Sequence, residues 1–296
     1  MPIDFSHLSR SASIAISVFA YIAAIGLAVV AGSLTPTSWH PLATIAVADI
    51  VGTIVIFLFS FSFNNSSFYD PYWSVKPAVI ALYYLLAFPD SGTPVRRWLV
   101  LILAFLYGIR LTANFYRGWP GLVKQDWRYT MLQSQYPKTY WLISFSGIHF
   151  FPTLMVYLAC LPMYPAMVKS ASSLSFLDIA GSIVTFLAVL IAFIADEQMG
   201  KFRQNPENSG RIMTSGLWRH SRHPNYLGEI LTWWGLWFFA IACGLEWWWT
   251  GIGALSIMLM FIFISIPMMD EHLKERKAGF GEHMQKTRAI IPLPVK

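Results

Sequence analysis

The chain has 296 residues, of which 56% are hydrophobic and only 12% are charged, and its mean hydropathy is +0.52. Soluble domains carry about 25% charged residues, so this composition excludes an ordinary water-soluble protein and indicates one that crosses a membrane several times. The formal net charge is +6, but the basic residues form no continuous tract, which argues against nucleic acid as a partner. Cys160 and Cys243 both lie in apolar segments and show neither a disulfide framework nor the paired spacing of a metal site.

Apolar runs that are long enough, or nearly long enough, to cross a bilayer as helices occur along the whole chain. In chain order they cover residues 14–34, 43–63, 98–115, 148–168, 176–195, 226–243 and 247–267. A shorter run, Val75–Phe88, can cross only if its polar flanks help. We therefore predict an all-α polytopic membrane bundle of about eight transmembrane helices, within a range of roughly seven to ten.

Lysine and arginine residues concentrate in alternate loops of this predicted bundle. The inner segments of an eight-span arrangement hold most of them, including Lys76, whereas the outer loops hold few apart from Arg96 and Arg97. The positive-inside rule then predicts that both termini are cytoplasmic. The segments richest in polar residues all fall on that cytoplasmic face, where we expect them to contribute to one site, and they are 64–73, 114–140, 196–226 and 270–292.

The segment Asn64–Trp73 mixes turn-forming residues with aromatic rings, among them those of Tyr69, Tyr72 and Trp73. An aromatic belt at the membrane interface explains these rings more simply than catalysis does. Asp70 is the charged residue of this segment and is therefore its candidate functional group.

Arg110 and Asn114 lie one helical turn apart near the end of an apolar run, and Asp126, Arg128 and Tyr129 follow in the next polar segment. Arg110 is unusually deep for an arginine in an apolar run. Two interpretations stay open for it, a ligand-binding role or a side chain that extends to the lipid headgroups. The later three residues could likewise form a structural ion pair with an aromatic anchor.

Asp196 and Arg203 follow the apolar run 176–195 and share one face if that helix continues. A carboxylate and a guanidinium at a membrane edge suit a ribose hydroxyl and a phosphate, respectively. Glu197 and Lys201 form an i, i+4 pair on the same stretch, which is typical of a solvated helix face. The sequence thus favours a ligand role for Asp196 and Arg203.

The densest polar segment, Gly216–Glu229, leads directly into an apolar run and reads Gly-Leu-Trp-Arg-His-Ser-Arg-His-Pro-Asn-Tyr-Leu-Gly-Glu. Pro224 suits the first turn of a helix, where its missing N–H is not needed, and His223 would precede that helix as its cap. Polar groups at a membrane boundary are costly, so their density here indicates a functional site.

Asn225, Glu229 and Thr232 follow at spacings that place them on one face of the predicted helix. A carboxylate inside an apolar helix costs about 2.5–3.5 kcal/mol to insert, so Glu229 is expected to face protein or a polar ligand. The alternative is that Glu229 pairs with Arg222 and only fixes the end of the helix.

His220 and His223 lie three residues apart, but together with one acid they supply too few ligands for zinc, so we expect no metal. No glycine-rich phosphate loop precedes a helix in the sequence. A nucleotide would therefore bind this chain without a Rossmann fold.

The Gly-Leu-Trp, Arg-His-Pro-Asn-Tyr and Gly-Glu elements of Gly216–Glu229 resemble those of the steroid 5-alpha-reductase superfamily, in its bacterial membrane branch. The stretch Asp196–Arg203 and the Arg-x-Ile-Ile-Pro ending at Arg288–Pro292 carry the same resemblance. It covers the C-terminal part of the chain, whereas the N-terminal half matches only in general pattern. The Gln-Glu pair that helps to polarise the substrate carbonyl in steroid reductases has no counterpart in that half.

This resemblance implies one integral membrane domain over 1–296, with the substrate side in 1–175 and a reductase-like cofactor region in 176–296. It implies a bacterial inner-membrane enzyme whose site faces the cytoplasm and which uses NADPH to reduce a C=C bond of a lipophilic, enone-like substrate. By their positions in the matching motifs, the resemblance would place the following residues around the cofactor: Asp196, Arg203, Asn225, Tyr226 and Glu229.

Hydride transfer assigns tasks to the candidate residues. Arg203 or Arg222 could hold phosphate, while Asn225 and Glu229 could orient the nicotinamide carboxamide. Arg110 and Asn114 complete the predicted cofactor set. The catalytic candidates are Glu229, Tyr226 and Tyr129, and the proton donor stays open among Tyr226, Tyr129 and Tyr69.

Two other classes of protein stay open. Isoprenylcysteine and phospholipid methyltransferases also carry an Arg-His-Pro-x-Tyr-x-Gly element and bind S-adenosylmethionine there. Asn225 after the proline and Glu229 after the glycine favour the reductase version. The third class is a membrane protein without enzymatic activity, in which the polar cluster only seals a helix junction.

Overall fold

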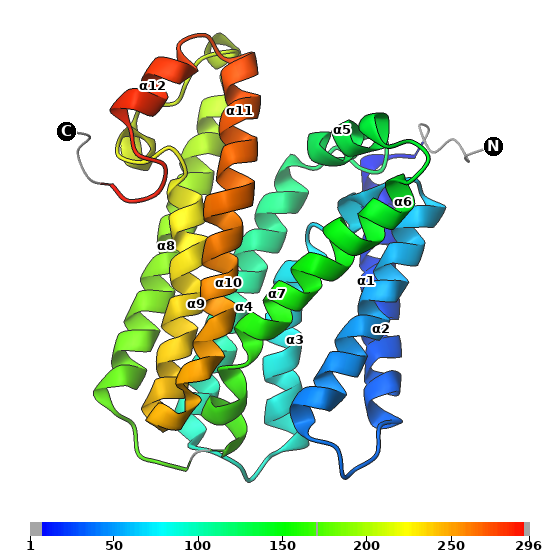
Figure 1. Cartoon of the computed structure of the whole chain (residues 1–296), viewed down its shortest axis with the longest axis vertical. Coiled ribbons are helices and arrows are strands. Elements are labelled where there is room, and N and C mark those ends of the chain that lie inside the picture. The colour runs from blue at the N-terminus through cyan, green and yellow to red at the C-terminus, as the bar shows by residue number, and fades with distance from the viewer. Residues whose placement is uncertain (1–7, 170, 293–296) are drawn as a thin grey trace. The chain divides into compact units, whose positions relative to one another are not determined.

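The computed structural model describes residues 8–169 and 171–292. Every regular element in these ranges is a helix, so the predicted all-α class is confirmed (Figure 1). Seven helices in this part of the chain are long and apolar enough to span a membrane, which agrees with the predicted range of roughly seven to ten. They are Arg10–Ser33, Pro41–Ser62, Pro94–Gly118, Tyr140–Lys169, Phe176–Gln204, Pro224–Cys243 and Leu245–Arg276.

By its internal contacts the chain divides into two compact units. Unit 1 comprises the chain up to Ala87 together with Gly108–Leu161, and unit 2 comprises Phe88–Tyr107 together with the chain from Pro162 onward. The helix α4 (Pro94–Gly118) contributes to both units. The predicted boundary between 1–175 and 176–296 followed motifs rather than contacts, and it stays a prediction.

Unit 1 is built from three successive helices and the segments packed around them. Its elements are α1 (Arg10–Ser33), α2 (Pro41–Ser62), η1 (Ser66–Phe68), α3 (Tyr72–Ala87), the later part of α4, α5 (Trp127–Gln135), α6 (Tyr140–Ile143), η2 (Ser144–Phe150) and α7 (Phe151–Cys160). α1 and α2 form an antiparallel pair joined by a short turn (Figure 1). Ala20 and Ala24 are fully buried in α1, and the Tyr21 hydroxyl donates to the carbonyl of Phe68 at 2.8 Å, which ties α1 to η1.

The helix α3 corresponds to the short run predicted at Val75–Phe88. It has 16 residues and contains Pro77. At about 1.5 Å per residue this length gives roughly 24 Å, which is less than the hydrocarbon core of a bilayer. α3 is therefore absent from the seven spans, although the Ser74 hydroxyl bonds Thr112 of α4 at 2.8 Å and fastens it within the unit.

Unit 2 is organised around a long, closely packed pair of helices, α8 and α9. Its elements are the earlier part of α4, η3 (Pro165–Lys169), α8 (Phe176–Gln204), η4 (Pro206–Asn208), η5 (Gly216–Arg219), α9 (Pro224–Cys243), η6 (Leu245–Gly251), α10 (Ile252–Met260), η7 (Phe261–Ser265), α11 (Ile266–Arg276) and α12 (Phe280–Lys286). A Cβ at Gly228 would lie 2.5 Å from the carbonyl oxygen of Ala188, and one at Gly235 would lie 2.8 Å from the amide nitrogen of Thr185. These two glycines therefore let the backbones of α8 and α9 approach closely, as small residues do in membrane bundles.

Arg96 and Arg97, the exceptions to the charge bias of the predicted outer loops, are buried in unit 2. Arg96 Nε and Nη2 donate to the two carboxylate oxygens of Asp178 at 2.6 and 3.0 Å. Arg97 donates to the carbonyls of Phe88 and Pro89, each at 2.6 Å. Both arginines are therefore internal structural groups, which explains why they depart from a rule that concerns charges free in loops.

Large apolar side chains remain exposed on the long helices of both units. On α1 the exposed fraction is 62% for Phe19 and 65% for Ile22, and on α8 it is 57% for Ile179. Apolar patches of this kind are costly in water and are the usual lipid-facing surface of membrane helices. The lipid bilayer is thus the environment that this helical bundle requires.

Candidate functional site

The Gly216–Glu229 segment is attached to the end of α8 within unit 2. Gly216 has φ of 59°, in the left-handed region, and a Cβ there would lie 2.5 Å from the Gln198 side chain. Leu217 N donates to Gln198 Oε1 at 2.9 Å, and Trp218 Nε1 donates to the carbonyl of Ala195 at 3.0 Å. These bonds fix the Gly-Leu-Trp element beside the last turns of α8, where Asp196 lies.

The backbone at the start of α9 agrees with the prediction, whereas the His223 side chain does not. Pro224 occupies the first turn and His223 is the N-cap residue, as predicted. The His223 side chain makes no capping bond; its Nε2 lies 2.8 Å from Asp270 Oδ1 of α11. The imidazole also stacks on Tyr226, with ring centroids 5.0 Å apart and planes 9° apart. The ring centroid of Phe261 lies 4.8 Å from that of Tyr226.

Arg222 binds the C-terminal segment of unit 2. Its Nη2 lies 2.7 Å from Asp270 Oδ2, and its Nη1 donates to the carbonyls of Met284, at 3.2 Å, and Thr287. The ion pair of Arg222 is therefore with Asp270 and not the predicted alternative with Glu229. This gives Arg222 a structural task that the sequence did not indicate, and its phosphate-binding role stays a prediction.

Asn225 and Glu229 lie one turn apart inside α9. Glu229 is 4% exposed, so its carboxyl group is buried, as the sequence predicted. Asn225 is half-buried, and its Oδ1 is inaccessible to solvent and has no hydrogen-bond partner. The Thr232 hydroxyl donates its hydrogen bond to the carbonyl of Gly228 in its own helix at 2.9 Å, so this donor is already occupied. An amide oxygen that is buried and unsatisfied costs about 1–3 kcal/mol and is a natural contact for a ligand N–H.

The helix α8 continues to Gln204, which meets the condition for Asp196 and Arg203 to lie on one helix. Asp196 is buried at 9% exposure, whereas Arg203 is exposed. Burial, together with the nearby positive charge of Arg203, lowers the pKa of Lys277 just beyond α11. The positive charges of Lys277 and Arg203 repel each other, and a bound anion would relieve this repulsion. Lys277 was missed in the sequence, where it reads as one basic residue among several in a charged tail.

The other candidates, Arg110, Asn114 and Tyr129, belong to unit 1. Arg110 is buried at 8% exposure and Asn114 is half-buried. Tyr129 lies in α5, and its hydroxyl donates to Asp70 Oδ1 at 2.5 Å. The structure thus brings together two segments, around Asp70 and around Tyr129, that the sequence presented separately.

Two more charged groups complete this cluster in unit 1. Arg128 Nε donates to Asp126 Oδ1 at 2.7 Å, and its Nη2 lies 3.5 Å from Asp70 Oδ1. Burial raises the pKa of Asp70 to about 7, while the charge of Arg128 acts in the opposite direction. Asp126 also caps α5 by accepting from the backbone N–H of Arg128. The structural ion pair, one of the two interpretations left open, is therefore present, and the Tyr129 hydroxyl donates to the same Asp70 carboxylate that Arg128 approaches.

A buried ion pair between Asp49 of α2 and Lys76 of α3 was missed in the sequence. The two side chains are 2.8 Å apart. Asp49 is the single carboxylate in the apolar run 43–63, which is the feature that could have identified it. Lys76 was counted among the loop charges that orient the chain, but it lies inside a helix at 5% exposure. In the described residues, no group of three or more His, Cys, Asp or Glu side chains is arranged to hold a metal ion.

The fold and these buried polar groups define a polytopic helical membrane protein with a candidate ligand site at the start of α9. The chain belongs to the family described as protein of unknown function DUF1295, whose model matches residues 56–287. It is also 30% identical, over 201 residues, to the uncharacterised protein C594.04c of Schizosaccharomyces pombe. That match covers 60% of this chain and 58% of the relative, so it spans less than two thirds of the relative's length. No solved structure matches the chain.

Proposed function

We propose that the protein is a membrane-embedded reductase that uses NADPH to reduce a C=C bond of a lipophilic, enone-like substrate of steroid or isoprenoid type. The motif resemblance to the steroid 5-alpha-reductase superfamily supports this reaction class. With it we propose a site that faces the cytoplasm in a bacterial inner membrane. The observation that carries the proposal is the buried, unsatisfied Oδ1 of Asn225, one turn from the buried Glu229.

The residues of unit 2 fit NADPH in three respects. The Asn225 amide oxygen lacks a donor, and a nicotinamide carboxamide N–H is a donor of suitable size. Arg203 and Lys277 supply positive charge for phosphate groups, which arginine in particular binds through paired N–H donors. Asp196 lies buried beside the docked Gly216 segment, where a carboxylate can accept from a ribose hydroxyl.

When bound, NADPH supplies the hydride, and the tasks left to the chain are orientation, exclusion of water and proton delivery. Asn225 and Glu229 orient the reacting ring from one face of α9. The burial of Glu229 shows that water has little access to this part of the helix, and water exclusion protects a hydride donor.

Proton delivery has one candidate in unit 2. The phenol ring of Tyr226 contacts the rings of both His223 and Phe261, and these contacts restrict its orientation. The His223 imidazole beneath it is in turn held by Asp270. In unit 1, Tyr129 bonds Asp70 and Tyr69 bonds Thr153, and both remain alternative donors.

The proposal is tested by the thermal stability of the detergent-purified protein with NADPH, NADH or S-adenosylmethionine. A ligand present at 100 times its dissociation constant adds about 2.7 kcal/mol to the free energy of unfolding. We expect this shift with NADPH, and we expect Asn225→Ala and Glu229→Gln to abolish it. Matched controls are Asn208→Ala, on η4, and Glu207→Gln, which is exposed.

Three results would overturn the proposal. A shift with S-adenosylmethionine alone would identify a methyltransferase. No shift with any of the three ligands, or a shift with NADPH that both α9 variants leave unchanged, would return the polar cluster of α9 to a structural role.

A further inference from the structure

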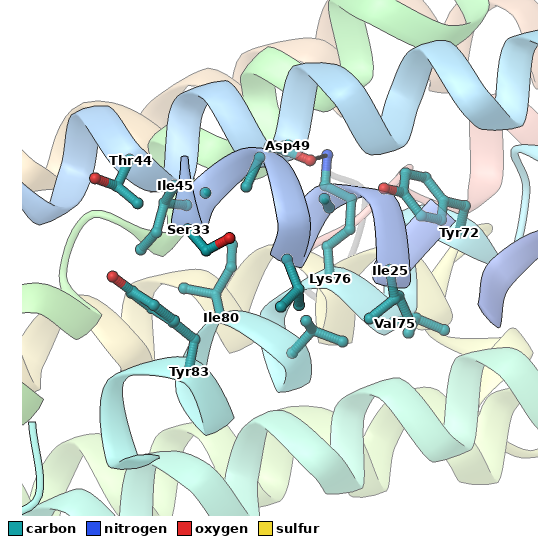
Figure 2. Close-up of a pocket in the computed structure, with 15 residues that line it drawn as sticks. Ile25, Ser33, Thr44, Ile45, Asp49, Tyr72, Val75, Lys76, Ile80 and Tyr83 are labelled. Carbon is teal, nitrogen blue, oxygen red and sulfur yellow. Dashed lines mark ion pairs between the residues drawn. The ribbon is translucent and has the colours of Figure 1, made fainter. Parts of the chain in front are cut away.

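Unit 1 contains a pocket of about 270 Å³ between α1, α2 and α3 (Figure 2). Small and branched apolar side chains make up most of its wall, among them Ile25, Ile45 and Ile80. Ligand pockets in proteins range from about 300 to 1,000 Å³, so this one lies at the lower end of that range.

The polar part of this pocket is the ion pair of Asp49 and Lys76. Figure 2 shows the two side chains pointing toward each other across the pocket, one from α2 and one from α3. Their relative exposures are 8% and 5%, and Asp49 Oδ1 lies 2.8 Å from Lys76 Nζ. Removing two charges from water costs several kcal/mol for each, so a buried pair needs further hydrogen bonds to become favourable.

Those further hydrogen bonds are missing. Asp49 Oδ2 is inaccessible to solvent and has no hydrogen-bond partner. Lys76 Nζ, although close to Oδ1, makes no well-directed hydrogen bond at all. The pair therefore offers an acceptor and a donor at one place in an apolar pocket. A pair that served only to join α2 to α3 would be better satisfied internally, and apolar residues of similar volume would join the helices as well.

Tyr72 lines the pocket beside this pair. Its ring centroid lies 5.7 Å from Lys76 Nζ, and its hydroxyl packs against Gly52, so closely that a Cβ at position 52 would collide with it. Gly52 lies one turn beyond Asp49 on α2. The absence of a side chain at Gly52 thus lets an aromatic ring stand next to the charged pair.

We propose that this pocket binds a lipophilic alcohol, with the hydroxyl group between Asp49 and Lys76 and the hydrocarbon part along α1 and α3. A hydroxyl meets both needs through a single oxygen atom, because it donates to Asp49 Oδ2 and accepts from Lys76 Nζ. A ketone would leave Asp49 Oδ2 unsatisfied, and an amine would place its positive charge next to Lys76. The site lies within unit 1 and is independent of the proposed nucleotide site in unit 2.

The test measures binding of decan-1-ol, decan-2-one and decane to the detergent-purified protein, without nucleotide, by displacement of a tritiated decan-1-ol tracer. Hydrogen bonds to charged groups make the alcohol bind at least about tenfold more tightly than the alkane, with the ketone between them. Asn225→Ala must leave this order unchanged, so that a failure of the proposed reductase function does not affect the result.

The variants separate binding from folding. Asp49→Asn or Lys76→Met alone leaves one buried charge without its partner and could prevent folding, so the informative protein is the double variant Asp49→Leu/Lys76→Met. It should fold with unchanged or higher thermal stability and bind all three ligands with equal affinity. Ala48→Leu, which adds volume to the pocket wall, should weaken all three together.

Equal affinity of the wild-type protein for alcohol and alkane would overturn the proposal, because the pocket would then be a crevice for any hydrocarbon chain. An alcohol preference that persists in the double variant would overturn it as well, since the hydroxyl would then bind elsewhere.

Discussion

Replacing Arg222 by methionine should strongly destabilise unit 2 and release its C-terminal segment. Arg222 and Asp270 have side-chain exposures of 10% and 6%, so the pair is largely removed from water. Arg222→Met keeps much of the side-chain volume but removes the donors to Asp270, Met284 and Thr287. Removing one partner of a buried pair costs about 3–5 kcal/mol, because the remaining charge stays buried. His223 remains as a partner of Asp270, which places the expected loss toward the lower end of that range.

Two assays report on this variant. Thermal unfolding gives the loss of stability, and limited trypsin digestion gives the release of the C-terminal segment through faster cleavage after Lys286 and Arg288. Arg211→Met is the matched control, because Arg211 is exposed in the same unit. If Arg222→Met unfolds at the temperature of the control and is cleaved at the same rate, Arg222 does not hold this segment and the reasoning is wrong.

Two further predictions concern other parts of the fold. Burial raises the pKa of Asp70 to about 7, so the folded protein holds a proton on this carboxyl group that the unfolded chain releases near pH 4. The contribution of Asp70 to the free energy of unfolding therefore falls as the pH rises from about 4 to about 7. Thermal unfolding at about pH 5 and about pH 8 should show this loss in the wild-type protein and a smaller one in Asp70→Asn; equal losses in both would contradict it. Gly228→Ala should cost about 1–3 kcal/mol, because the new Cβ would lie 2.5 Å from the carbonyl oxygen of Ala188. Gly200→Ala, which meets nothing within 4 Å, should be neutral or stabilising in the same unfolding assay, and a similar loss in both would argue against close packing of α8 and α9.

Features that depend on local sequence were predictable. The position of Pro224 in the first turn of α9, with His223 before it, follows from proline geometry over a few residues. The burial of Glu229 follows from the cost of a carboxylate in an apolar run. Each of these inferences needs only the neighbouring residues.

Partnerships between distant residues were not predictable. Arg222 pairs with Asp270, 48 residues away, although Glu229 lies much closer in sequence. Arg96 and Asp178 are 82 residues apart, and only their packed helices bring them together. Asp49 could have been noticed as a lone carboxylate in an apolar run, but nothing in the spacing joins it to Lys76 on another helix. Such pairs depend on how helices pack, which a single sequence does not specify.

The most direct test of the proposed reductase function follows two labels in one reaction. The purified protein, in lipid nanodiscs, is incubated with NADPH deuterated at the transferable position, with S-adenosylmethionine labelled in its methyl group, and with a lipid extract of the source membrane. We predict that deuterium becomes bound to a carbon atom of a lipid product. Asn225→Ala should reduce this transfer, whereas Asn208→Ala should not. Appearance of the labelled methyl group without deuterium, or transfer of neither label, would contradict the proposed function.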